Sequence, residues 1–312
     1  MNNISSPELS VVIPMYNESE SLEPLFATLI PVLEKTSKNW EILCVNDGSE
    51  DNTLEGLRYY HQQDPRIRYI SLSRNFGKEA ALTAGLNHAF GKAVIPFDAD
   101  LQDPPEVILS LVEKWREGYK VVLASRQKRD GDSFFKRIFA TLFYKFMRLM
   151  HINLPKNTGD FRLMDQQVVA VIRLLPERSR FMKGLFSWVG FSTAQIFFDR
   201  PEREVGKSKQ SLKSLISLAK DGVFSFTTLP LRLATYLGLI ISFFAFGYGG
   251  WLLIRVLIQG VDVPGYASIM AAVLCMGGIQ LVSLGIIGEY LGRVYNETKQ
   301  RPLFIIEEKS EL

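Results

Sequence analysis

Cysteine and histidine are scarce in this chain, which limits the kinds of site that it can build. The 312 residues include two cysteines and three histidines, and the histidines show no spacing typical of metal ligands. Cys44 lies in a short apolar run and Cys275 in a long uncharged one, so both are expected to pack as apolar side chains. We therefore expect neither a zinc cluster nor chemistry at the histidines.

Charge is missing from two long stretches near the C-terminus. Residues 233–253 and 267–287 contain no charged side chain, and each stretch is about 20 residues long, enough for a helix to cross a hydrocarbon core. Two transmembrane helices are therefore predicted, at about 233–257 and 267–289. A buried helical pair in a soluble protein is the alternative, although such helices normally keep a polar face.

The charges around these stretches predict how the chain is oriented. The amino terminus lacks the basic start and apolar stretch of a cleaved signal peptide. The connection between the two stretches carries Arg255 and Asp262 as its charges, whereas the flanks are rich in lysine and arginine. By the positive-inside tendency, both flanks face the cytoplasm. We predict an integral protein of the inner (cytoplasmic) membrane, with a cytoplasmic domain at 1–210, the helix pair within 230–292 and a cytoplasmic tail at 293–312.

Short β-branched runs alternate with helical patterns along the first part of the chain. Such alternation is typical of an α/β fold with a mainly parallel sheet. Ligands of these sheets bind beyond the carboxyl ends of the strands, so we expect a site in the loops there. Strands are predicted at 9–14, 40–45, 67–72, 93–97 and 120–124, and helices at 20–35, 51–63, 78–90 and 105–117.

Two further segments combine apolar and basic side chains at helical spacing. Residues 133–150 place phenylalanines and leucines beside lysines and arginines, a pattern typical of helices that lie in the membrane interface. A core helix of the soluble domain fits the same spacing. Residues 211–229 lead directly into the first uncharged stretch, so a juxtamembrane amphipathic helix is predicted there.

Polar residues follow three of the predicted strands, and the aspartates after the fourth strand indicate a metal site. Asp98 and Asp100 stand one residue apart after the apolar run 93–97, and alternate side chains of an extended segment share a face. Two such carboxylates can hold Mg²⁺ or Mn²⁺ against the diphosphate of a nucleotide, while Ala99 faces the core. A solvated turn rich in aspartate is the alternative for this motif alone.

The loops after the first two strands offer the rest of a nucleotide pocket. Asp47 can accept a hydrogen bond from a pyrimidine N–H, Tyr16 can lie against the base, and Glu18 can hold the ribose hydroxyls. Gly48 allows a turn or a close backbone approach. Each motif alone is also typical of an ordinary turn or helix start, but their succession on neighbouring strands indicates one nucleotide site.

In these motifs the chain resembles the inverting GT-A glycosyltransferases that include dolichyl-phosphate mannose synthase and bactoprenol glucosyltransferase. The resemblance extends over nearly the whole length, and its last segment is similar to the bacterial branch with two C-terminal helices. It implies a Rossmann-like GT-A domain that transfers a sugar to a polyprenyl (undecaprenyl) phosphate at the membrane. The segments that carry it are 11–18, 45–53, 73–79, 98–106, 158–163, 200–210 and 288–302.

The resemblance also implies which residues contact each reactant. For the metal it implies Asp98, Asp100 and Gln102, and for the nucleotide sugar it implies Pro14, Tyr16, Glu18, Asp47, Lys78, Asp98 and Asp100. The phosphate head of the lipid acceptor needs countercharge beside an anionic donor, and arginine forks suit phosphate oxygens. A solvated basic face is the alternative for any one of these cations. The expected acceptor and diphosphate contacts are Arg126, Arg129, Arg200, Arg203, Lys207 and Lys209.

Asp160 and Asp100 are the expected catalytic carboxylates. Asp100 is expected to act through the metal, which stabilises the charge that builds on the departing phosphate. Asp160 stands where a general base would be sought. A phosphate acceptor is already largely ionised near neutral pH, however, so a base contributes little, and we expect Asp160 to orient a basic side chain or the acceptor head.

Glucose from UDP-glucose is the predicted donor, because the two-helix pattern is most similar to the bactoprenol glucosyltransferase branch. Mannose from GDP-mannose, or an amino sugar, is the alternative. A processive polysaccharide synthase would be expected to have a Gln-x-x-Arg-Trp motif, which the sequence lacks, and a non-catalytic membrane scaffold would not need the acidic cluster. No nucleic-acid partner is expected. Close helix contacts in a homo-oligomer are permitted by Gly238, Gly247, Gly249, Gly277 and Gly278.

Overall fold

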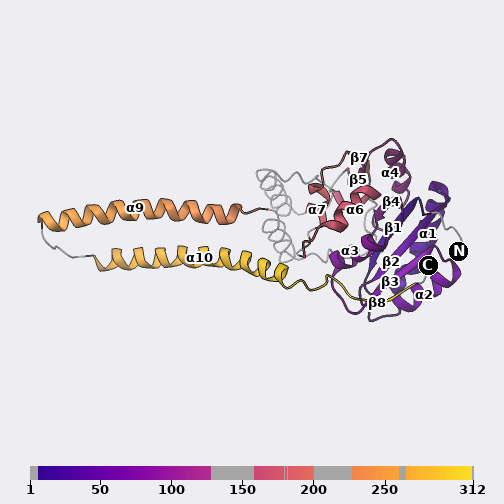
Figure 1. Cartoon of the computed structure of the whole chain (residues 1–312), viewed down its shortest axis with the longest axis horizontal. Helices are drawn as coiled ribbons and strands as arrows, with labels where there is room; N and C mark the ends of the chain where they lie inside the picture. The colour runs from indigo at the N-terminus through magenta and orange to yellow at the C-terminus, as the bar shows by residue number, and fades with distance from the viewer. Residues whose placement is uncertain are drawn as a thin grey trace. The chain divides into compact units, whose positions relative to one another are not determined.

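The computed structural model describes residues 6–127, 158–178, 180, 182–199, 227–259 and 265–310. The chain divides into two compact units, Met1–Leu215 with Arg301–Leu312, and Ile216–Gln300. The first contains a sheet with its helices and the second contains two long helices (Figure 1). The amphipathic helices predicted at 133–150 and over most of 211–229 lie outside the described residues.

An eight-stranded sheet forms the centre of the first unit, in the strand order β7-β5-β6-β4-β1-β2-β3-β8. Strands β1 to β4 pair in parallel and β5 is parallel to β7, whereas β6 and β8 are antiparallel to their neighbours. The predicted α/β fold with a mainly parallel sheet is confirmed. The strands are β1 Leu9–Met15, β2 Trp40–Asn46, β3 Ile67–Leu72, β4 Ala93–Pro96, β5 Val121–Arg126, β6 Thr158–Asp165, β7 Thr193–Phe198 and β8 Ile306–Lys309.

Helices cover both faces of this sheet (Figure 1). The core on one face is formed with α1 Leu22–Thr36, α2 Thr53–Gln63 and α4 Val107–Arg116, and the other face carries α3 Lys78–His88 and α6 Gln166–Leu174. The period-two alternation of β1 explains this, because Val11 and Ile13 join the first core while Val12 points to α3. A Cβ added at Gly85 would come within 2.2 Å of Val12 Cγ1, so this glycine lets α3 lie close on the sheet.

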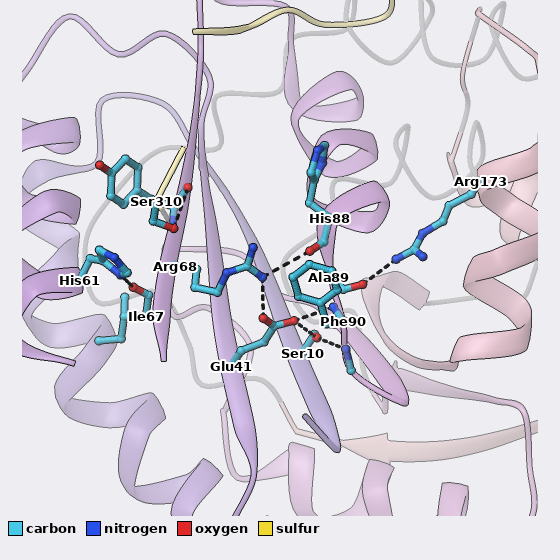
Figure 2. Close-up of polar contacts among 12 residues, drawn as sticks. Ser10, Glu41, His61, Ile67, Arg68, His88, Ala89, Phe90, Arg173 and Ser310 are labelled. Carbon is cyan, nitrogen blue, oxygen red and sulfur yellow. Dashed lines mark hydrogen bonds and ion pairs between the residues drawn. The ribbon is translucent and has the colours of Figure 1, made fainter. Parts of the chain in front are cut away.

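A buried polar network lies at the amino edge of the sheet, where α3 ends (Figure 2). Glu41 of β2 forms an ion pair of 2.7 Å with Arg68 of β3 and accepts a hydrogen bond from Ser10 Oγ of β1. The same carboxylate accepts from the backbone N of Phe90 at 2.7 Å, and Ser10 Oγ accepts from Gly91 N at 2.7 Å. Three strands thereby hold the turn that follows α3.

The last carbonyls of α3 have cationic partners as well. Arg173 of α6 donates to the carbonyl oxygen of Leu86 at 2.7 Å. It also donates to that of Ala89 at 2.7 Å, as Figure 2 shows. Carbonyl groups at the C-terminal end of a helix lack partners within the helix and interact favourably with cations. The position of α3 is therefore fixed from its C-terminal end, while its first residue, Lys78, lies at the opposite edge of the sheet.

The C-terminal segment adds a strand that the sequence did not predict. β8 pairs antiparallel with β3 and forms the edge of the sheet. Glu308 of β8 forms an ion pair with Arg58 of α2 and accepts a hydrogen bond of 2.7 Å from Tyr69 Oη. The chain therefore returns to the first unit after the long helices.

The second unit consists of α9 Leu229–Gln259 and α10 Tyr266–Thr298, which lie side by side (Figure 1). Both helices are long and apolar enough to cross a membrane, and their most apolar windows are not buried. Large side chains such as Phe246 and Leu257 are more than four-fifths exposed. Long helices with this much uncovered apolar surface indicate association with a membrane.

Candidate functional site

The loops that follow β1 and β2 are hydrogen-bonded to each other at the carboxyl edge of the sheet. The backbone N of Asn17 donates to Ser49 Oγ at 2.9 Å, and the backbone N of Glu18 donates to Thr53 Oγ1 at 2.9 Å. Asn17 has a φ of 54°, which asparagine adopts more readily than most residues. The structure thus brings these two polar clusters together.

Three predicted nucleotide contacts lie at the end of β1 or in the loop that follows it. Pro14 lies within β1, paired with Val45 of β2, so it shapes the edge through its backbone position. The ring of Tyr16 is 42% exposed, which leaves it available to a base. The carboxylate of Glu18 accepts a hydrogen bond from Ser21 Oγ at 2.6 Å, and this bond fixes one of its two oxygens.

Asp47 organises the loop after β3. It is 3% exposed, and its two carboxylate oxygens accept hydrogen bonds from the backbone N of Phe76 at 2.7 Å and of Gly77 at 2.8 Å. Burial raises the pKa of Asp47, against the lowering effect of these two bonds. Gly48 has a φ of 64°, and a Cβ there would collide with the backbone of Arg74. Asp47 and Gly48 therefore fix the segment that leads into Lys78.

Lys78 joins two carboxylates that come from different strands. Its Nζ lies 2.6 Å from Asp98 Oδ1, beyond β4, and 3.1 Å from Asp160 Oδ2 in β6. Burial alone would lower the pKa of Lys78, but Asp98 and Asp160 raise it above its ordinary value. The ammonium group is therefore charged at neutral pH, and it lies between the expected metal site and the expected catalytic carboxylate.

The segment after β4 was predicted to be extended, but it forms a turn at Ala99 and Asp100, and the predicted burial of Ala99 is confirmed. Ala99 is 5% exposed, whereas Asp98 and Asp100 on either side of it are accessible. Asp100 Oδ1 accepts a hydrogen bond from the backbone N of Gln102 at 3.2 Å, and Leu101 between them has a φ of 50°. The turn thus keeps Gln102 beside Asp100, while Ala99 is anchored in the core.

Arg126, the last residue of β5, lies at the same edge. Its guanidinium is 3.4 Å from Asp103 Oδ1, whose side chain is 8% exposed, and a Cβ added at Gly159 of β6 would lie 3.9 Å from Arg126 Nη2. A buried carboxylate beside an arginine fixes the direction of its fork. Arg126 is therefore held by Asp103, with part of its side chain open to solvent.

Arg162 is a residue at this edge to which the sequence assigned no role. It is 2% exposed, donates to the carbonyl oxygens of Gly159 at 2.7 Å and Asp160 at 3.3 Å, and lies 4.3 Å above the ring of Phe186. Burial lowers its pKa to about 10, against the opposite effect of Asp160 and Glu79. These bonds hold the backbone that presents the Asp160 carboxylate. In the sequence, Arg162 stands between the apolar residues Phe161 and Leu163 and two residues after Asp160, and this position could have indicated that its side chain is buried near the site.

The donor set fits a divalent cation that shares its ligands with a diphosphate. Among the described residues, no three His, Cys, Asp or Glu side chains are grouped closely enough to bind a metal by themselves. Asp98 and Asp100 supply accessible carboxylate oxygens, and Mg²⁺ in nucleotide sites is commonly held by one or two carboxylates together with substrate phosphates and water. A cation held here would need further ligands, such as diphosphate oxygens or water, to complete its coordination.

Several predicted cations cannot be placed in this geometry. Arg129, Arg200, Arg203, Lys207 and Lys209 lie outside the described residues. The described edge therefore contains the residues expected on the donor side, and Lys78, Arg126 and Arg162 are among its basic side chains.

Comparisons with known proteins match both parts of the chain to glycosyltransferases. Residues 10–173 match the glycosyl transferase family 2 domain, and residues 229–294 match the GtrB C-terminal hairpin. An uncharacterized glycosyltransferase of Synechocystis is 55% identical to this chain, over 96% of this chain and 95% of its own. The SfII prophage-derived bactoprenol glucosyl transferase of Shigella flexneri is 46% identical, over 96% and 97%. The prophage bactoprenol glucosyl transferase homolog of Escherichia coli is 45% identical, over 96% and 98%.

Proposed function

The chain belongs to glycosyl transferase family 2, and from this we propose that it transfers glucose from UDP-glucose to a polyprenyl phosphate, with inversion. The family and the GT-A α/β fold expected from the sequence are confirmed, and so is the C-terminal two-helix hairpin. The observation that carries the proposal is the meeting of Lys78, Asp98 and Asp160 at the carboxyl edge. The near full-length similarity to bactoprenol glucosyl transferases supports the choice of sugar and acceptor.

The proposed reaction is a single displacement. An oxygen of the acceptor phosphate forms a bond to the anomeric carbon while the bond from that carbon to UDP breaks on the opposite face. Asp98, Asp100 and Gln102 would hold a divalent cation, which supplies countercharge for the departing diphosphate. Lys78 adds a positive charge on the same side, and its ammonium contacts both Asp98 and Asp160.

The acceptor side is proposed from charge and membrane association. Arg126 at the described edge would contact the acceptor phosphate, together with the predicted cations Arg129, Arg200, Arg203, Lys207 and Lys209. The flanking basic residues support a catalytic unit on the cytoplasmic side. Glycines along α9 and α10 have open space around them, which supports the proposal of a homo-oligomer.

The proposal is tested with the full chain in detergent, supplied with radiolabelled UDP-glucose and undecaprenyl phosphate. We expect label to pass into the organic phase, and addition of EDTA to stop the transfer. GDP-mannose and UDP-N-acetylglucosamine, run in parallel, distinguish glucose from the alternative sugars. Absence of labelled lipid with every donor would contradict the proposed function.

Asp160 is proposed to position Lys78 and the acceptor head, because its carboxylate already contacts an ammonium group at 3.1 Å. The substitution Asp160→Asn keeps the shape and removes the charge. If Asp160 positions Lys78 and the acceptor head, Asp160→Asn loses the same fraction of activity at low and high pH. If it removes a proton, the loss shrinks as the pH rises and the acceptor ionises without help.

A further inference from the structure

Lys78 contacts a carboxylate that is proposed to bind the donor's cation. Its Nζ lies 2.6 Å from Asp98 Oδ1, and Asp98 is one of the two carboxylates proposed to hold the metal. We propose that Lys78 is a counter-ion that keeps metal affinity low in the donor-free enzyme, so that the cation is held firmly only with a nucleoside diphosphate. This inference rests on the proposed function.

The first argument is that ammonium and metal compete for the same carboxylate. A cation bound to Asp98 would have the Lys78 ammonium as a close neighbour, and like charges repel strongly at such distances where water is partly excluded. Without Lys78, Asp98 and Asp160 would both lose the ammonium group that now compensates their charge. With Lys78 present, one of these negative charges is already compensated.

The second argument is that Lys78 can leave Asp98 at little cost. The side chains of Lys78 and Asp98 are 48% and 41% exposed, so water reaches both when they separate. Asp160, the second partner, is 18% exposed and keeps a contact for the ammonium group at 3.1 Å. A diphosphate bound beside the cation is a further anion, so the Lys78 ammonium can contact the diphosphate when it leaves Asp98.

The third argument is that the backbone before Lys78 is held in place, whereas the long Lys78 side chain can change its conformation. Asp47 holds the backbone of Phe76 and Gly77 directly before it, and α3 begins at Lys78. The ammonium can therefore move by side-chain rotation without a shift of the helix. Metal and nucleotide then favour each other's binding, and such coupling is reciprocal.

The test measures Mn²⁺ binding by electron paramagnetic resonance of the free ion, using the full chain in detergent, with and without UDP. For the wild type we expect weak binding that UDP strengthens. For Lys78→Met without UDP, we expect Mn²⁺ to bind about tenfold more tightly than to the wild type. Addition of UDP should then increase the Mn²⁺ affinity of this variant less than it does for the wild type. Lys78→Arg keeps the charge and is expected to resemble the wild type.

Asp98→Asn separates failure of this inference from failure of the proposed function. If Asp98→Asn weakens Mn²⁺ binding while Lys78→Met leaves the UDP-free affinity unchanged, the cation site stands and the role of Lys78 is overturned. If no variant binds Mn²⁺ even with UDP, the proposed cation site fails as well. Thermal unfolding of each variant shows that it is folded, and Lys78→Arg supplies the comparison should Lys78→Met unfold.

Discussion

Helix α3 has an ion pair near each end, and the two differ in their access to solvent. At the amino edge of the sheet, the side chains of Arg68 and Glu41 are 10% and 6% exposed. At the carboxyl edge, those of Lys78 and Asp98 are 48% and 41% exposed. The first pair is completed by backbone N–H groups and a serine (Figure 2), whereas the second faces solvent. The buried pair at the amino edge therefore stabilises one fixed arrangement, whereas the exposed pair at the carboxyl edge can separate and contact other charged groups.

The largest expected effect concerns the exposed edge. Replacing Asp100 with asparagine should lower the rate of glucosyl transfer roughly thousandfold, because stabilisation of the departing diphosphate is lost. The free energy of unfolding should change by less than about 0.5 kcal/mol, as for most surface substitutions. Transfer rates and chemical denaturation of the same preparation check both parts. A transfer rate equal to that of the wild type would show that this edge does not hold the cation.

The buried edge should respond in the opposite way. Glu41→Ala removes the carboxylate that pairs with Arg68 and accepts a hydrogen bond from the Phe90 N–H. Because Arg68 then stays buried without this partner, the free energy of unfolding should fall by about 3–5 kcal/mol. The remaining folded protein should retain its transfer rate per molecule. The matched control is Glu117→Ala at the solvent-exposed pair with Lys114, where no measurable change is expected. Equal stability of the two variants would contradict the distinction between the edges.

A smaller effect is expected at Arg162, which is buried like Arg68 but lies at the carboxyl edge. Arg162→Met keeps an apolar contact with Phe186 and removes the bonds to the Gly159 and Asp160 carbonyls. Because a bond from a charged donor contributes about 1.5–3 kcal/mol, the transfer rate should fall roughly tenfold to a hundredfold. Arg162→Lys should not restore it, since an ammonium cannot reproduce the fork. A wild-type rate in Arg162→Met would show that Asp160 is positioned without it.

The smallest effect is expected at Glu308, in the exposed strand β8. Hydrogen bonds from Arg58 and Tyr69 lower the pKa of Glu308 to about 2. A carboxyl group whose pKa is lowered on folding stabilises the fold above its unfolded pKa, and this stability is lost as the pH falls toward the folded pKa. Glu308→Gln should therefore lower the Tm slightly at pH 7, and the difference should shrink as the pH is lowered from about 4.5 toward 2. A difference that persists in acid would contradict this account.

The sequence predicts the parallel core of this fold well. The strands of that core are mainly apolar and are followed by polar loops, and helical segments lie between them. The convergence of the loops after β1, β2 and β4 follows from parallel pairing alone. Asp98 and Asp100 could therefore be assigned to one edge before any side chain was placed.

The antiparallel strands and the ion pairs were harder to predict. β8 is four residues long and reads Ile-Glu-Glu-Lys, so its pairing with β3 depends on contacts far away in the sequence. The Lys78–Asp160 contact depends on β6 reversing direction within the sheet, and no local pattern gives that reversal. Arg162 follows Asp160 by two residues, and its burial depends on the packing of Phe186 from a later helix.

The return of the chain through β8 means that the catalytic unit is tethered to the helical hairpin on both sides. One covalent connection precedes α9, and the other follows α10 and ends in a strand paired with β3. A single cut after α10 would leave the covalent connection before α9 intact, whereas after a cut before α9 only the pairing of β8 with β3 would keep the catalytic unit attached to the hairpin.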